Sequence, residues 1–303
     1  MGKRKSTAEE KMASKDKMDV DGDDNNSEEE EEEDDASIIN IDFEWFDPRP
    51  EIDFHGLKML LRQLFDVDND LFDLSELTDM ILAQPLLGST VKCEGEESDP
   101  YAFLTVLNMH HHREKPVMKQ LTDYLISKAS TQPTTQQQLR ALLSPDNSQA
   151  QVGLILTERF INMPSEIVPP MYNMIRSEIA AAVADNEPYN FTHYLLISKT
   201  YTEVASKLDA EDDRPQKKKK ATAAGGESEK FYFHPEDEAL HRYAMGVCNY
   251  DYDKVSDEGA SDAKRTFQEL GVKPQGHLIL IEGGKFEEAV KGVGEYLGGD
   301  AVA

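Results

Sequence analysis

The hydrophobic pattern changes its period between residues 38 and 65, and this change predicts a strand followed by a helix. From Ile39 to Trp45 apolar and polar residues alternate, which indicates a strand with one buried face. Two prolines between Asp47 and Pro50 then end the strand, because proline lacks an amide donor and restricts the residue before it. Beyond them, apolar residues recur at helical spacing at Phe54, Leu57, Leu60, Leu61 and Leu64. We expect this helix to pack back onto the strand.

Strand-like and helix-like patterns then follow one another to the end of the chain. Apolar runs predict strands over 87–93, 101–109, 151–160, 190–204, 246–250 and 276–282, with a short strand near 231. Helical spacing predicts helices over 74–82, 115–130, 171–183 (after Pro169 and Pro170), 262–270 and 285–297, with shorter ones within 131–144 and after Pro235. Residues 101–109 are apolar on both faces, which favours a central strand. The class is therefore α/β or α+β, with one main sheet.

Two segments lack any apolar period, and we predict that both are disordered. The acidic tail, residues 1–37, holds 15 acidic and 6 basic residues. Its unbroken acidic run consists of Glu28, Glu29, Glu30, Glu31, Glu32, Glu33, Asp34 and Asp35. The second segment is a polar insertion at about 209–230, which contains Lys217, Lys218, Lys219 and Lys220. Residues 38–303 apart from this insertion are expected to form a single folded domain.

The charge of the chain excludes some partners and favours others. The formal net charge is -27, and outside the tail 44 acidic residues still face 26 basic ones. Such a field repels nucleic acid phosphates and anionic membranes and attracts basic proteins. The acidic tail is either a solvating segment or an anionic arm that shields a basic client. The four lysines are either part of a solvated loop or a nuclear import signal.

Compartment and membrane signals point to a soluble intracellular protein. Cys93 and Cys248 belong to no metal or disulfide spacing, which indicates a reducing compartment. The first residues contain no apolar segment that would serve as a signal peptide. No apolar run approaches the roughly 18 residues that a membrane span needs. We expect no membrane insertion.

No group of residues has the spacing of a metal or catalytic site. Three aspartates between Asp66 and Asp70 fit the start of a calcium loop, but Leu71 and Leu77 stand where glycine and glutamate are required. The consecutive histidines 110–112 follow a predicted strand and have no further ligand nearby, so they indicate a strand end. Catalytic motifs of hydrolases and metalloproteases are absent from the sequence. We therefore expect no catalytic residues, no cofactor and no metal.

Two glycine-containing stretches near the end of the chain raise the question of phosphate binding. Gly283, Gly284 and Lys285 follow a strand, but Ile279 and Phe286 break the P-loop pattern. Residues 291–294 (KGVG) are similar to part of a coenzyme A pyrophosphate loop, but they lie late in a predicted helix. Neither stretch supports a nucleotide or coenzyme site.

Four stretches resemble the BCCIP family, named for its BRCA-interacting animal members. They are NIDFEWFDPRPEIDFHGLKMLLRQLF, GSTVKCEGEESDPYAFLTVLNM, ERFINMPSEIVPPMY and FHPEDEAL. The resemblance runs from about Ile38 to the C-terminus, and the chain is most similar to fungal members of the Bcp type. It implies a three-layer fold similar to GNAT acetyltransferases, without established acetyltransferase activity, and it supplies no catalytic residues.

The resemblance also implies a nuclear or shuttling protein that acts through partners. Fungal relatives are linked to chaperoning a large-subunit ribosomal protein and to nuclear export, including export of a phosphatidylinositol phosphate kinase. Animal relatives add ribosome biogenesis and genome maintenance. The leading hypothesis is therefore a non-enzymatic acidic chaperone and adaptor for a basic ribosomal protein, with nuclear transport factors as further partners.

Two alternatives belong to other classes. The first is a divergent coenzyme-A-dependent acyltransferase, suggested by the fold resemblance alone. The second is a nuclear export adaptor whose main cargo is another protein, such as the lipid kinase. An export signal with leucine spacing is conceivable in Leu57–Leu64 or Leu74–Leu82, although both segments fit core-facing helices better.

Overall fold

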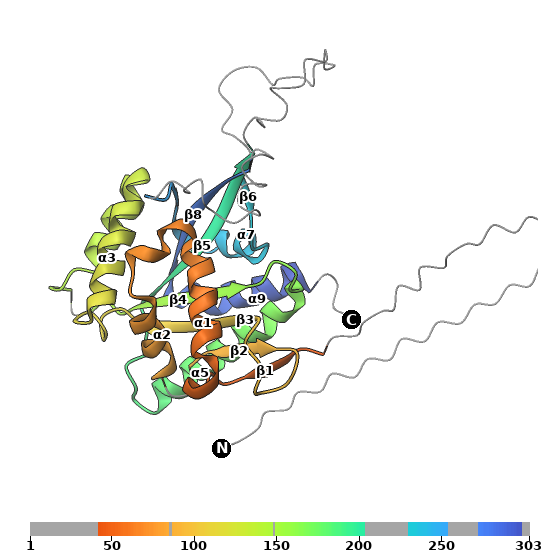
Figure 1. Cartoon of the computed structure of the whole chain (residues 1–303). Helices are drawn as coiled ribbons and strands as arrows, with labels where there is room; N and C mark the ends of the chain where they lie inside the picture. Colours follow the sequence, from red (N-terminus) through yellow and green to blue (C-terminus); the bar gives the residue numbers. More distant parts are fainter. Residues whose placement is uncertain (1–41, 85–86, 148, 204–229, 254–271, 299–303) are drawn as a thin grey trace, which may run out of the picture. The chain divides into compact units, whose positions relative to one another are not determined.

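Figure 1 shows the computed structural model, which describes residues 42–84, 87–147, 149–203, 230–253 and 272–298. The chain divides into two compact units, Met1–Asn40 and Ile41–Ala303, and every described residue belongs to the second. The acidic tail, the helix predicted over 262–270 and all but the last residue of the predicted insertion lie outside the described residues. That last residue, Lys230, is the first residue of a strand.

A mostly antiparallel sheet forms the centre of the described unit. Its path runs β1-β2-β3-β4-β5-β8-β7, and β6 pairs with β5. Among the described pairs, only β4 and β5 are parallel. The strands are β1 (Glu44–Phe46), β2 (Ser89–Lys92), β3 (Ala102–Asn108), β4 (Val152–Arg159), β5 (His193–Glu203), β6 (Lys230–Tyr232), β7 (Ala244–Tyr250) and β8 (Val272–Glu282).

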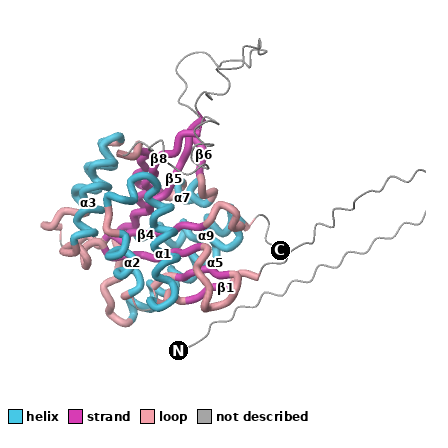
Figure 2. Tube along the Cα trace, viewed as in Figure 1, coloured by secondary structure: helices cyan, strands magenta, loops and turns pink. Residues whose placement is uncertain are grey.

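Helices cover both faces of this sheet, as the ribbon and tube views show (Figures 1 and 2). One face carries α1 (Pro50–Phe65), α2 (Leu74–Leu82), α3 (Pro116–Lys128) and α4 (Pro133–Leu142). The other carries α5 (Val168–Ala184), α7 (Glu236–His241) and α9 (Phe286–Leu297). Short 3-10 turns are η1 (Asp66–Leu71), η2 (Ala129–Thr131), η3 (Ser165–Ile167) and η4 (Gly283–Lys285). The predicted mixed sheet flanked by helices is confirmed, whereas the similarity to acetyltransferases stays a prediction.

Alternate residues of the central strands enter two separate hydrophobic cores. In β4, Leu154 and Leu156 join the core under α1 to α4, while Ile155 joins the core under α5, α7 and α9. Leu195 and Leu196 of β5 divide in the same way. Successive side chains of a strand point to opposite faces, so a strand covered on both sides must be apolar throughout. This is why residues 101–109 show no alternation.

Prolines mark the N-termini of several helices. Pro50, Pro116 and Pro133 are the first residues of α1, α3 and α4, where the missing amide hydrogen has no intrahelical acceptor. Helix α5 was expected to begin after Pro169 and Pro170, but it begins at Val168 and holds both prolines in its first turn. The first-turn amides of a helix lack intrahelical partners, so two prolines are tolerated there.

The segments considered as export signals are core helices. Leu57, Leu60, Leu61 and Leu64 of α1 are at most 1% exposed. Helix α2 likewise buries Leu74, Leu77, Ile81 and Leu82. The interpretation of both segments as core-facing helices is therefore confirmed.

The aspartates between 66 and 70 serve the fold. They form η1, and Asp68 is fully buried. Tyr124 donates its hydroxyl hydrogen to Asp68 at 2.9 Å, and Lys128 Nζ lies 3.5 Å from the same carboxylate. Asp68 thereby fastens η1 to α3.

We predict that Leu61→Ala lowers the free energy of unfolding by about 2–5 kcal/mol, because it leaves a cavity between α1 and the sheet. Met59 is the matched control, since it lies on the same helix and is 49% exposed. Met59→Ala should change the free energy of unfolding by no more than about 0.5 kcal/mol. Urea denaturation of both variants measures the difference. Equal effects would contradict the assignment of α1 to the core.

Candidate functional site

A group of buried charged and polar side chains lies where β4 and β5 separate. These parallel strands pair only from Val152↔His193 to Ile155↔Leu196, although both continue beyond this point. Charged and polar side chains from β4, β5 and the β6–α7 segment occupy the region. This buried charge cluster consists of Glu158, Arg159, Ser198, Lys199, His234, Glu236 and Asp237.

Glu158 is the centre of one half of the cluster. Its two oxygens lie 2.5 Å from Lys199 Nζ and 3.1 Å from His234 Nε2. Lys199 also donates to the backbone oxygen of Gln63 at 3.1 Å, which ties β5 to α1. Burial raises the pKa of the Glu158 carboxyl, but Lys199 and His234 outweigh burial and bring the pKa to about 2. Glu158 is therefore a carboxylate at neutral pH.

The other half of the cluster joins β4 and β5 to α7. The Arg159 guanidinium makes two hydrogen bonds to the Glu236 carboxylate, one of them at 3.1 Å. Ser198 donates its hydroxyl hydrogen to Asp237. Burial raises the pKa of the Asp237 carboxyl, and the neighbouring Glu236 adds to this rise. The cluster thus links three segments that are distant in sequence.

The arrangement of the cluster favours a structural role. Ser198, His234 and Asp237 are residue types of hydrolase triads, but Ser198 donates to Asp237, so the required serine-to-histidine hydrogen bond is missing. All seven side chains belong to buried residues. Neither the cavity between α7 and α9 nor the cavity beside Lys128 is lined by a member of the cluster. Its charged groups neutralise one another inside the protein.

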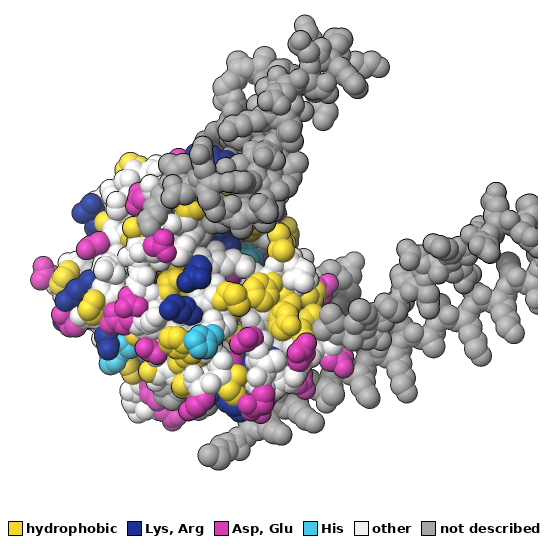
Figure 3. All heavy atoms as spheres, in the orientation of Figure 1, with side chains coloured by type: hydrophobic (Ala, Val, Ile, Leu, Met, Phe, Trp, Pro, Cys, Tyr) yellow, Lys and Arg dark blue, Asp and Glu magenta, His cyan; other side chains and the backbone are white. Residues whose placement is uncertain are grey.

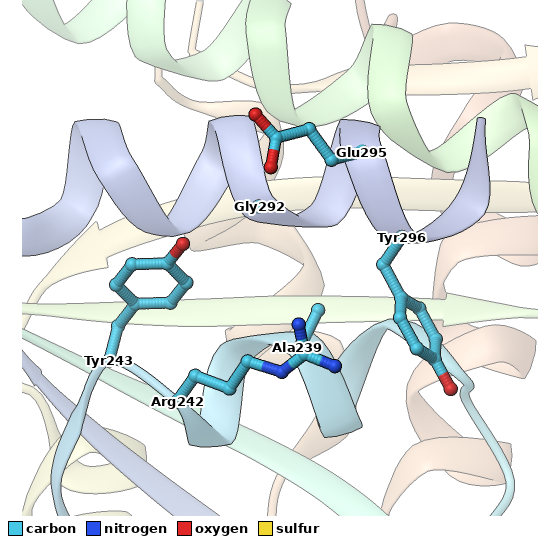
Figure 4. Close-up of a pocket in the computed structure, with 6 residues that line it drawn as sticks. All are labelled: Ala239, Arg242, Tyr243, Gly292, Glu295 and Tyr296. Atoms are coloured by element: carbon cyan, nitrogen blue, oxygen red, sulfur yellow. The ribbon is translucent and has the colours of Figure 1, made fainter. Parts of the chain in front are cut away.

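A surface pocket of about 270 Å³ lies between α7 and α9 (Figure 4). Figure 4 shows Arg242 between the rings of Tyr243 and Tyr296, with Gly292 on the helix above them in this view. The Arg242 guanidinium lies 5.6 Å from the Tyr296 ring centre, and Tyr296 donates to Glu238 at 2.6 Å. A Cβ atom at residue 292 would come within 2.7 Å of the Tyr243 ring, so glycine allows this close packing.

The packing in this pocket accounts for the glycine of the KGVG stretch, so no coenzyme site is needed to explain it. Residues 291–294 lie inside α9, where backbone amides are used within the helix. A pyrophosphate loop needs free amides at a helix N-terminus. The stretch therefore positions Gly292 against Tyr243 and does not form such a loop.

The histidines do not assemble a metal site. His110 Nε2 donates to the backbone oxygen of Leu142 at 3.0 Å, and its Nδ1 accepts from the Val152 amide. His241 and His277 face each other with Nε2 atoms 2.6 Å apart, and burial lowers the pKa of His277 to about 3. Within the described ranges, no three histidine, cysteine, aspartate or glutamate side chains group as metal ligands.

Exposed carboxylates gather at one end of the sheet. Arg49, which caps α1, lies 2.9 Å from Glu96 and 2.8 Å from Glu97 in the β2–β3 loop. Its amide donates to Asp53 at 2.7 Å, and Asp53 forms a buried ion pair with Lys92. These contacts hold together a surface that we call the acidic corner. It consists of Asp47, Glu94, Glu96, Glu97 and Asp99, all of them exposed.

Comparison with known proteins decides the family. The family model BCCIP matches residues 38–240. The chain belongs to the BCCIP family. It is 61% identical to Protein bcp1 of Aspergillus fumigatus over 86% of this chain and 88% of that protein. It is 50% identical to Protein bcp1 of Schizosaccharomyces pombe over 84% of this chain and 89% of that protein.

A solved structure shows the same fold. The crystal structure of BCP1 from Saccharomyces cerevisiae aligns with a TM-score of 0.57 at 26% identity. The alignment covers 87% of this chain and 92% of the other. Residues 38–240, which match the BCCIP model, include the acidic corner and the whole buried charge cluster. Arg242, Tyr243 and α9 lie beyond that match.

The site residues predicted from the sequence are not among the residues that the structure describes. The acidic run Glu28–Asp35 and the lysines 217–220 lie outside the described residues of this BCCIP-family chain. The acidic corner was not predicted, although the sequence EGEESDP already showed the charges of the β2–β3 loop. What the sequence did not show is that Arg49 binds this loop. Among the helices in the described ranges, none is long and apolar enough to cross a membrane.

We predict that Glu158→Gln lowers the free energy of unfolding by about 3–5 kcal/mol, because it leaves the Lys199 ammonium buried without a carboxylate. Adding Lys199→Met should recover part of this loss, since it removes the orphaned charge. Urea denaturation at pH 7 measures both variants. A double variant no more stable than Glu158→Gln alone would contradict the pairing.

The same pair should contribute to acid denaturation. The pKa of Glu158 is lower in the folded protein than the roughly 4.3 expected when unfolded. Its stabilisation is therefore fully present above that unfolded value and is lost as the pH falls toward about 2. Between these values, the double variant should lose less stability than the unmodified protein.

Proposed function

We propose that this chain is a non-enzymatic acidic chaperone and adaptor that binds and shields a basic protein of the large ribosomal subunit. It supports nuclear export and ribosome biogenesis, resides in the nucleus and shuttles to the cytoplasm with the help of nuclear transport factors. One observation carries the proposal: the acidic excess occupies both the tail and the rest of the chain, and gives a net charge of -27. Membership of the BCCIP family supports it.

Electrostatics explains why such a chain suits such a client. A ribosomal protein presents lysines and arginines for rRNA phosphates, and these side chains repel one another when the RNA is absent. Carboxylates on a partner take the place of the phosphates and raise the rate of association. The acidic corner supplies such carboxylates on the folded unit, and the acidic tail supplies them on a separate segment.

The interior of the folded unit favours binding over catalysis. The carboxylates, the ammonium and the guanidinium of the buried charge cluster are paired, and the KGVG stretch forms part of helix α9. An export adaptor for another cargo, such as a lipid kinase, is the alternative. Export factors read exposed signals, whereas Leu57–Leu64 and Leu74–Leu82 supply their leucines to the core. These segments therefore favour the chaperone.

The test uses proteins extracted from purified large ribosomal subunits, passed over the immobilised full-length chain at low salt. We expect stoichiometric retention of one basic protein. Its affinity should fall steeply as the salt concentration rises toward about 1 M, where the Debye length is about 3 Å. Mass spectrometry identifies the protein, and titration at several salt concentrations measures the affinity. If no ribosomal protein is retained, the proposed function is wrong.

A chain that lacks residues 1–37 separates the role of the tail from that of the folded unit. The truncation should slow association or make the complex less soluble, while the urea denaturation midpoint stays unchanged. An unchanged affinity and association rate would mean that the tail only solvates the protein.

Nuclear import is tested at the lysines. Replacement of Lys217, Lys218, Lys219 and Lys220 by glutamine removes the positive charge that an import receptor would bind. We expect the fluorescently tagged variant to shift from nucleus to cytoplasm relative to the unmodified chain. Replacement of Lys3, Arg4 and Lys5 by glutamine is the matched control. An unchanged distribution in the lysine variant would assign import to another segment.

A further inference from the structure

An apolar patch lies next to the acidic corner. Ile161, in the loop after β4, is 83% exposed, the highest exposed fraction among the large hydrophobic side chains of the described residues. Phe160 is half-buried beside it and packs edge-to-face against Tyr101, with ring centres 5.8 Å apart. The amide of Phe160 donates to the Tyr101 backbone oxygen at 3.1 Å. The loop is therefore held in place while Ile161 points away from the core.

Helix α1 adds a further apolar side chain to this patch. A Cβ atom on Gly56 would come within 2.4 Å of Pro100, so α1 lies directly against the residue before Tyr101. About two turns later, Gln63 donates to the Arg159 backbone oxygen at 2.8 Å. Met59 lies between these contacts on the same side of the helix and is 49% exposed. Figure 3 shows hydrophobic side chains gathered on this face, with acidic side chains beside them.

The chain itself joins the apolar patch to the acidic corner. Asp99 stands two residues before Tyr101, and Arg49 fixes the rest of the β2–β3 loop through Glu96 and Glu97. Both surfaces are thus built on the same rigid contacts between α1, β2 and β3.

We propose that the apolar patch, made of Met59, Tyr101, Phe160 and Ile161, and the acidic corner together dock the basic client. An apolar side chain of the client packs beside Ile161, while neighbouring lysines or arginines face the carboxylates of the corner. This proposal depends on the proposed function. It adds where on the folded unit the client binds.

Charge complementarity selects this occupant over others. A second copy would bring its own acidic corner, and the acidic tail carries the unbroken run Glu28–Asp35, so both are repelled. The lysines 217–220 have the right charge, but the surrounding sequence QKKKKATAAGG has no large apolar side chain to cover Ile161. A basic partner with an apolar anchor satisfies both parts of the surface.

The test compares Ile161→Asp with Val183→Asp in the full-length chain. Val183 is the control because it is also exposed, at 37%, and lies at the C-terminal end of α5, about four helical turns from the end of α5 that follows the Ile161 loop. The probe is the ribosomal protein that the unmodified chain retains from purified large subunits. Packing against Ile161 predicts about tenfold weaker binding for Ile161→Asp and no change for Val183→Asp. If charge alone attracted the client, both variants would bind it more tightly than the unmodified chain, because each adds a negative charge.

A photo-crosslinking residue at position 161 identifies the occupant directly. A crosslink to the ribosomal protein supports the proposal, whereas a crosslink to residues 204–229 or to a second copy overturns it. Equal binding by the two aspartate variants also overturns the docking surface, while the chaperone function stands. If the unmodified chain retains no ribosomal protein, the proposed function itself fails. Unchanged thermal melting of both variants shows that folding is not the cause.

Discussion

The parallel pair β4 and β5 sets the constraint that the rest of the fold has to satisfy. Two strands that part in the middle of a sheet leave backbone groups and charged side chains away from water, and burial of an unpaired charge is costly. The buried charge cluster resolves this with mutually paired groups. Lys199 reaches Glu158, Arg159 reaches Glu236, and Ser198 reaches Asp237. The segment from β6 to α7 has to fold over this region, because it supplies three of the seven side chains of the cluster: His234, Glu236 and Asp237.

The two cores depend on the same strands. Since β4 and β5 are covered on both faces, their alternate residues bind α1 to α4 on one side and α5, α7 and α9 on the other. Helix α1 contributes most to the arrangement of the surface. Its leucines enter the core, its N-terminal Arg49 fixes the β2–β3 loop, and Gly56 brings it against Pro100. Core packing therefore determines where the acidic corner and the apolar patch lie.

Charge is used in opposite ways inside and outside this protein. In the interior, each carboxylate of the cluster has a partner, and the two signs balance closely. On the exterior, Arg49 is one cation among the five carboxylates of the acidic corner in the described part of the chain, so these groups leave a net negative potential for a partner to meet. A surface that combines such a potential with exposed apolar side chains suits association with a basic protein, because steering and packing act together.

The sequence by itself determined most of the elements, although not the starts of β1 and α5, and the tertiary structure decided how they are combined. Periodicity located α1, β3, β4 and α9, since a residue's neighbours along the chain decide which faces it can bury. Composition alone pointed to a basic partner. The pairing of Lys199 with Glu158, the contact of Arg49 with the β2–β3 loop and the exposure of Ile161 were not predictable. The first two contacts join residues far apart in sequence, and the exposure of Ile161 depends on what neighbouring segments leave uncovered. The hydrophobic pattern of a single strand carries no information about such contacts or such exposure.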